Sequence, residues 1–119
     1  MVAWLEGCTA TLVSSDWILP EFASALGIKV RRGELQHRHA KAAWEEFERF
    51  SQAGLRLVPV NRETFFRAAQ LIRQNRGSLR AGDSLHLASA VEIGASALAT
   101  ADAELEKNAR AVGITVTRF

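Results

Sequence analysis

The chain has 119 residues, a length that suits one domain, and 48% of them are apolar, which is enough to build a core. Fifteen Lys and Arg against thirteen Asp and Glu give a net charge of +2, which is compatible with nucleic acid but does not by itself indicate it. A single cysteine, Cys8, excludes an internal disulfide framework and is typical of a reducing cytoplasm. No apolar run approaches bilayer length and no basic-then-apolar leader opens the chain, so we expect a soluble cytoplasmic protein without membrane contact.

Helices alternate with short strands along the whole chain. Periodicity and turn residues predict the end of a helix at 1–5, a strand at 12–14, helices at 15–31 and 34–52, an edge strand at 55–60, helices at 62–75 and 82–93, a buried strand at 97–100, a helix at 103–111 and a last strand at 114–117. This alternation predicts one α/β domain over residues 1–119, with three layers, a doubly wound, mostly parallel sheet and flanking helices.

Two of these helices carry further predictions. Ser15 or Asp16 is expected to cap the helix at 15–31, and Asn61 is expected to cap the helix at 62–75. Four apolar residues of the latter helix are predicted to face inward; they are Phe65, Phe66, Ala69 and Ile72.

The stretch 79–102 is the part of the chain around which the rest is arranged. Its helix, between Gly82 and Gly94, is too apolar for a surface helix with one buried side, and its strand at 97–100 is followed directly by Asp102. Asp83 at the start of that helix, Asp102 and Glu21 each occupy a place expected at the C-terminal edge of the sheet, where open α/β sheets bind ligands. Taken singly, each of the three acids could instead be a helix cap or a solvated residue near a helix N-terminus.

Three carboxylates brought together repel each other unless a cation is bound, and a hard ion such as Mg²⁺ or Mn²⁺ suits an all-oxygen site. Such a site favours phosphodiester hydrolysis. Thr100 either orients a carboxylate or water there or is an ordinary strand residue. Arg76 and Arg80 either hold phosphates near the site or lie on a solvated face. For His86, one turn after Asp83, a packed or hydrogen-bonded side chain is the preferred interpretation.

Three motifs then resemble the PIN domain, in particular the VapC-like toxin of bacterial toxin–antitoxin pairs. They are Ser15-Asp-Trp-Ile-Leu-Pro-Glu-Phe-Ala-Ser-Ala-Leu, Leu79-Arg-Ala-Gly-Asp-Ser-Leu-His-Leu-Ala-Ser-Ala and Ala99-Thr-Ala-Asp. The resemblance implies an Mg²⁺- or Mn²⁺-dependent endoribonuclease with Glu21, Asp83 and Asp102 as metal ligands and Thr100 in support. It also implies an RNA substrate, a cognate antitoxin and a homodimer.

The sequence departs from that family at its beginning. PIN domains open with a strand that carries a first Asp, followed by a helix ending in a Trp-Leu pattern, and this chain starts with the end of that helix. We therefore expect an N-terminally incomplete fold with a gap between the strands at 12–14 and 97–100, where each buried unpaired backbone group would cost about 1–3 kcal/mol. The two strands close up, another chain fills the gap, or the sequence is a shortened form.

These considerations leave three hypotheses. The first is a VapC-like ribonuclease impaired by the missing Asp. The second is a catalytically inactive PIN-fold module that binds an antitoxin or RNA. The third is a generic α/β binding protein whose three acids are helix caps.

Overall fold

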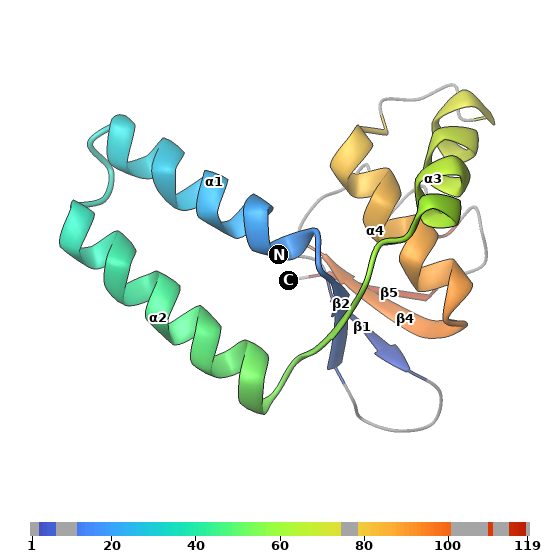
Figure 1. Cartoon of the computed structure of the whole chain (residues 1–119), viewed down its shortest axis with the longest axis horizontal. Helices are drawn as coiled ribbons and strands as arrows, with labels where there is room; N and C mark the ends of the chain where they lie inside the picture. The colour runs from blue at the N-terminus through green and yellow to red at the C-terminus, as the bar shows by residue number, and fades with distance from the viewer. Residues whose placement is uncertain (1–2, 7–11, 75–78, 101–109, 111–114, 119) are drawn as a thin grey trace.

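The chain is an α/β protein, as the sequence predicts, in a computed structural model that describes residues 3–6, 12–74, 79–100, 110 and 115–118 (Figure 1). Its elements in chain order are β1 (Ala3–Glu6), β2 (Leu12–Ser15), α1 (Ile18–Arg31), α2 (His37–Ala53), β3 (Arg56–Val58), α3 (Arg62–Gln74), α4 (Ala81–Glu92), β4 (Ala95–Thr100) and β5 (Thr115–Arg118). The helix predicted at 103–111 lies outside the described residues except for residue 110. In the described part of the chain, no helix is both long and apolar enough to span a membrane.

The strands form a single sheet in the order β3-β2-β1-β4-β5. β2 pairs with β3 and β4 pairs with β5 in parallel, whereas β1 runs antiparallel to both of its neighbours. The sheet is therefore less uniformly parallel than predicted. Because β1 is antiparallel to both β2 and β4, the four other strands all run in one direction, and their C-terminal ends lie at the same edge.

β1 corrects the prediction for the N-terminal residues. Residues 1–5 were predicted to be the end of a helix, but Ala3–Glu6 is a strand whose Trp4 pairs with Val13 on one side and with Leu98 on the other. It occupies the position between β2 and β4 that was expected to be empty. Backbone N–H and C=O groups in the middle of a sheet require partners, and an extended segment supplies them on both sides at once.

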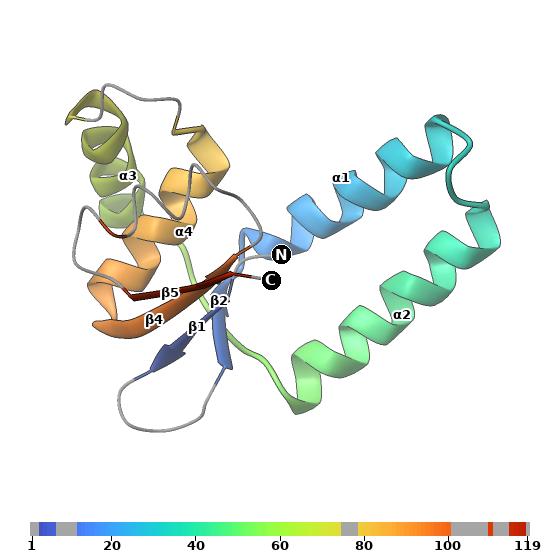
Figure 2. The same cartoon turned by 180° about the vertical axis from the view of Figure 1, so that it is seen from behind.

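Helices pack against both faces of β2 and β3. Successive strand residues point to opposite faces. Val13 and Val58 accordingly join a core cluster with Leu87 and Ala90 of α4, whereas Leu12 and Leu57 pack with Ile18 and Phe47 at the base of the α1–α2 hairpin. Beyond that base the hairpin projects away from the sheet, while α3 and α4 lie side by side (Figures 1 and 2). A doubly wound, three-layer arrangement of the entire chain stays a prediction.

α4 confirms the prediction of a helix buried on all sides. Seven consecutive residues of this helix are buried, from Ser84 to Ala90. The helix ends at Glu92, and Gly94 follows its C-cap residue with a φ of +68°, which agrees with the prediction that this glycine terminates the helix. A helix enclosed in this way is fixed in position, and its first turn is fixed with it.

The predicted inward face of α3 is wrong. Phe65 and Phe66 are 48% and 71% exposed, and the buried residues are Thr64 and Ala68. Thr64 Oγ1 donates to Glu92 Oε2 at 2.8 Å, and Ala68 packs in a cluster with residues of α4. Small side chains let the two helices approach closely, so the large aromatic residues are turned outward.

Of the two predicted helix caps, one is confirmed and the other is wrong. Asn61 caps α3 as predicted, because its Oδ1 accepts a hydrogen bond from Thr64 N at 3.1 Å; the same oxygen lies 3.0 Å from Thr64 Oγ1. For α1 the prediction is wrong, since the N-cap residue is Trp17 and no side chain caps it. The side chain of Ser15 turns toward α4 instead.

Candidate functional site

The end of β2 brings α1 to the C-terminal edge of the sheet. Ser15 is the last residue of β2, and the next residue, Asp16, donates its N–H to Val58 O of β3 at 2.8 Å. α1 begins three residues after Ser15 and carries Glu21 in its first turn. Glu21 therefore lies where β2 ends, as predicted, and next to the positive end of the α1 dipole.

The first turn of α4 lies against the same part of α1. A Cβ added to Gly82 would lie 2.9 Å from Trp17 Nε1 and 3.6 Å from Glu21 Oε2. This approach requires glycine, because any side chain would overlap the indole. It also places the carboxylate of Glu21 beside the residue that immediately precedes Asp83. The contact thus brings Glu21 of α1 to the first turn of α4, which also carries Asp83.

His86 lies behind this contact, one turn further along α4. Its side chain is only 1% exposed; its Nε2 is hydrogen-bonded to Glu21 Oε1, and its Nδ1 lies 3.2 Å from Ser15 Oγ. The preferred interpretation of His86 as a hydrogen-bonded side chain is confirmed. Its partners come from β2 and α1, so the imidazole joins three elements.

The predicted site residues have different outcomes. Glu21 lies beside Gly82, and Asp83 is the next residue of the same helical turn. Thr100 ends β4, opposite Arg118 of β5, at the edge where β2 also ends. Asp102 and Arg76 lie outside the described residues.

Two residues at the start of α4 bear on the alternatives that the sequence left open. Arg80 is exposed and is the N-cap residue of α4, three positions before Asp83. Asp83 lies inside the first turn of the helix and is not its N-cap residue. The hypothesis of a simple helix cap is thereby weakened for this acid.

β1 brings no carboxylate to this edge through its described residues. Ala3 pairs with Ala99 near the end of β4, whereas Glu6 pairs with Ala95 at its beginning. The five positions from Ala95 to Thr100 correspond to about 16 Å along a strand. The acid of β1 is therefore at the opposite end of the strand from the candidate site.

The residue types at this edge include those that a hard divalent cation prefers. Carboxylate oxygens are the preferred ligands of Mg²⁺ and Mn²⁺, and the Glu21 carboxylate keeps Oε2 on the side of Gly82 while Oε1 is bonded to His86. Within the described residues no group of three or more His, Cys, Asp and Glu side chains is gathered. Asp102, the third predicted ligand, is not among those residues.

Sequence reasoning missed three parts of this site. Ser15 was considered only as a helix cap, Trp17 was not considered, and Gly82 was treated as a helix boundary. Gly82 offered a signal, because a glycine immediately before an acid at a helix start often marks a close approach of another segment. The pairing of Ser15 with His86 joins residues 71 positions apart and left no local pattern.

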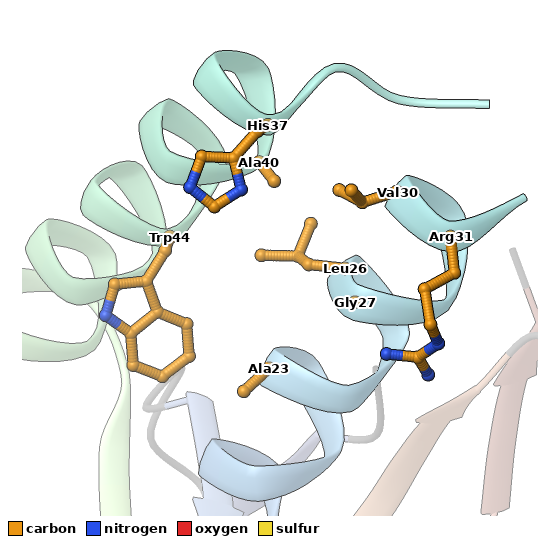
Figure 3. Close-up of a pocket in the computed structure, with 8 residues that line it drawn as sticks. All are labelled: Ala23, Leu26, Gly27, Val30, Arg31, His37, Ala40 and Trp44. Carbon is orange, nitrogen blue, oxygen red and sulfur yellow. The ribbon is translucent and has the colours of Figure 1, made fainter. Parts of the chain in front are cut away.

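A separate apolar pocket lies between α1 and α2 (Figure 3). At the base of the hairpin the rings of Phe22 and Phe47 are stacked with centroids 4.5 Å apart, and Trp44 packs beside them. Farther out, Leu26 and Val30 of α1 point toward α2 across a cavity of about 340 Å³. The lining residues are Ala23, Leu26, Gly27, Val30, Arg31, His37, Ala40 and Trp44.

Comparison with known proteins gives a family for the chain. The family model of the PIN domain matches residues 1–111, nearly the full length. A search of curated proteins found no match. PIN domains are generally nucleases and typically use divalent metals, which agrees with the donor set at the sheet edge. This match, together with the α/β fold, shows that the chain is a member of the PIN domain family.

Proposed function

We propose that this PIN domain is an Mg²⁺- or Mn²⁺-dependent endoribonuclease of the VapC-like toxin type, which hydrolyses phosphodiester bonds in RNA. The observation that carries the proposal is the convergence of Glu21 with the first turn of α4 around Gly82. This convergence lies at the edge where β2, β3, β4 and β5 all end, which is the ligand-binding edge of α/β sheets.

In this proposal Glu21, Asp83 and Asp102 hold the metal, and Thr100 at the end of β4 orients a carboxylate or a water. A bound metal supplies an activated water and stabilises negative charge on the phosphate. Arg80, exposed at the start of α4, and Arg76 bind RNA phosphates beside the acids. The protein's own task is to keep the carboxylates and the phosphate close together, because positioning accounts for a large part of phosphoryl-transfer catalysis.

Because β1 is antiparallel, we expect this proposed ribonuclease to have low metal affinity and low cleavage activity. In the resembled family an Asp comes from the strand in this position, whereas residues 3–6 place Ala3 nearest the site and Glu6 farthest from it. Three carboxylates bind a divalent cation with less charge than four. We therefore expect metal affinity and cleavage below those of a PIN domain with the full set.

Cleavage of a mixed RNA panel by the 119-residue chain tests the proposal. We expect cleavage that requires Mn²⁺ or Mg²⁺, stops on addition of a chelator, and falls to background in Asp83→Asn and Glu21→Gln. Glu46→Gln is the matched control, because Glu46 is an exposed acid on α2, distant in the fold from the sheet edge, and forms an ion pair with Arg49 of the same helix. Full cleavage by the Asp83 and Glu21 variants would refute the assignment.

The same proposal includes a cognate antitoxin, a homodimer and a cytoplasmic location. The lone Cys8 supports a reducing compartment. Size-exclusion chromatography with light scattering measures the oligomeric state, and co-expression with a protein encoded beside this one tests the antitoxin. Inhibition of cleavage by that partner is the expected result.

A second candidate function is a catalytically inactive PIN-fold module that binds an antitoxin or RNA. The apolar pocket between α1 and α2 favours it, because aliphatic side chains and Trp44 line a groove of a size that side chains of a peptide can enter (Figure 3). Leu26→Asp would abolish peptide capture through this groove while the variant chain stays folded. Stable partner binding by a folded chain with no nuclease activity would favour this function over the first.

A further inference from the structure

His86 is held by hydrogen bonds at both of its ring nitrogens. The ring is 1% exposed, with Nδ1 3.2 Å from Ser15 Oγ and Nε2 bonded to Glu21 Oε1. Ser15 is itself fully buried. An imidazole hydrogen-bonded at both ring nitrogens can neither rotate nor flip without losing these bonds. Its orientation is therefore set by the ends of β2 and α1.

The chemistry of Ser15 and Glu21 determines which ring nitrogen of His86 carries the hydrogen atom. Trp17 N–H donates to Ser15 Oγ at 3.3 Å, so the Ser15 hydroxyl is free to donate its own hydrogen to His86 Nδ1. An ionised carboxylate only accepts hydrogen bonds, so Nε2 must carry the ring hydrogen and donate it to Glu21. The donors thus run in one direction, from the backbone of Trp17 to the carboxylate of Glu21.

This chain of hydrogen bonds gives the two carboxylate oxygens of Glu21 different roles. The side chain is 38% exposed, and a glutamate without a partner at that exposure samples several rotamers. The bond from His86 occupies Oε1. The other oxygen, Oε2, lies on the side of Gly82, 3.6 Å from the position that a Cβ on that residue would take. A cation approaching from α4 would therefore find one oxygen already oriented.

We propose that His86 is a positioning residue that fixes Glu21 for a divalent cation, and that Ser15 fixes His86 in the tautomer this requires. The inference rests on the proposed function, because it assigns Glu21 as a ligand. A hydrogen bond to a ligating carboxylate lowers the cost of ordering it when the cation binds. Removal of such a partner typically weakens metal binding about 10–100-fold.

Two polar replacements of His86 distinguish a role in positioning Glu21 from a role in packing alone. In His86→Gln the amide nitrogen reaches the place of ring Nε2 and keeps the donor to Glu21. In His86→Asn the amide reaches only the place of Nδ1, so the contact with Ser15 remains and the donor to Glu21 is lost. We expect Mn²⁺ affinity, measured by titration calorimetry on the full chain, to be near wild type for His86→Gln and about 10–100-fold weaker for His86→Asn.

Ser89→Ala is the matched control on the same helix. Ser89 is buried in α4, and its hydroxyl has no hydrogen-bond partner among the described residues. Loss of that hydroxyl should leave Mn²⁺ affinity unchanged. A decrease equal to that of His86→Asn would show that any polar change inside α4 disturbs the site, and would overturn the specific role of His86.

Side-chain ¹⁵N NMR of the metal-free protein provides a readout that does not depend on metal or activity. The signals of His86 are those absent from His86→Gln, and we expect the Nε2–H tautomer. The Nδ1–H tautomer would overturn the inference even if the Asn variant does not fold. If wild type binds Mn²⁺ and His86→Asn binds it equally well, only the positioning role fails. If wild type shows no Mn²⁺ binding, the proposed function fails and this inference fails with it.

Discussion

Replacing Gly82 with alanine tests the contact on which the candidate site depends. The new Cβ would lie 2.9 Å from Trp17 Nε1, which is shorter than the van der Waals contact distance between a carbon and a nitrogen atom. The indole must therefore move. Because Glu21 follows Trp17 by one helical turn and donates its N–H to Trp17 O at 3.3 Å, movement at Trp17 is passed to the start of α1 and to the carboxylate.

Two opposing effects set the magnitude for Gly82→Ala. Alanine favours a helix over glycine by roughly 0.5–1 kcal/mol, while inserting a carbon into a filled site typically costs about 1–3 kcal/mol. We expect the free energy of unfolding to fall by about 0.5–2 kcal/mol, measured by urea denaturation followed by circular dichroism. Mn²⁺ affinity and RNA cleavage should fall as well, because Glu21 is displaced.

Gly27→Ala is the control for Gly82→Ala. Gly27 also lies in a helix, but a Cβ there would meet only the guanidinium nitrogen of Arg31, at 3.2 Å, at the end of a flexible side chain. We expect this variant to gain about 0.4–1 kcal/mol in unfolding free energy. If Gly82→Ala gains as much and binds Mn²⁺ normally, the close approach of α1 and α4 is not needed for the site.

Three further predictions concern the fold and are measured by urea denaturation. Leu87→Ala should lower the free energy of unfolding by about 2–5 kcal/mol, because Leu87 is enclosed between α4 and the sheet; a loss below 1 kcal/mol would contradict that placement. Asn61→Ala should cost about 1 kcal/mol through loss of the α3 cap, and an unchanged midpoint would show that Thr64 finds other partners. Phe66→Ala should stay within about 0.5 kcal/mol of wild type, whereas Phe47→Ala should cost about 3–5 kcal/mol; the reverse order would restore the face of α3 predicted from sequence.

The parts of the fold that could be predicted are those in which one local pattern leaves a single solution. α4 is an example, since apolar and small residues around its whole circumference permit only a buried helix. The edge position of β3 is another, because Pro59 ends the segment and proline is tolerated at sheet edges. Asn61 has the side chain and the position of a cap, and it caps α3.

The errors occurred where the partner of a segment decides its conformation. The large residues of α3 indicated one inward face, but the neighbouring α4 presents Ala88 and Leu85, and close packing against them selected Ala68. The four residues of β1 are too few to show a period of 3.6 or 2, so their sequence could not distinguish the end of a helix from a strand. In both cases the information lies in the neighbouring element and not in the segment.

The candidate site also has parts that the sequence could predict and parts that it could not. Acids at the starts of predicted helices and strand ends could be found from the sequence, and Glu21 and Asp83 were found in that manner. The contacts that orient them could not, because Gly82 with Trp17 and Ser15 with His86 join residues 65 and 71 positions apart. Chemistry-bearing residues are limited in type and therefore conspicuous, whereas the residues that position them are ordinary serines, glycines and tryptophans.

A strand between β2 and β4 has two separate tasks in the family, and the described residues of β1 perform one of them without the other. The first is pairing: β2 and β4 need a strand between them, because unpaired backbone groups in the middle of a sheet would cost about 1–3 kcal/mol each. Backbone groups are the same in every residue, so Ala3–Glu6 meets this requirement in the antiparallel direction. The second is a carboxylate at one particular end, which depends on side chain and direction together. Ala3 stands at that end and Glu6 at the other, so the described residues of β1 complete the sheet without placing an acid at that end. The stability of this fold and its affinity for metal should therefore respond to different substitutions in β1.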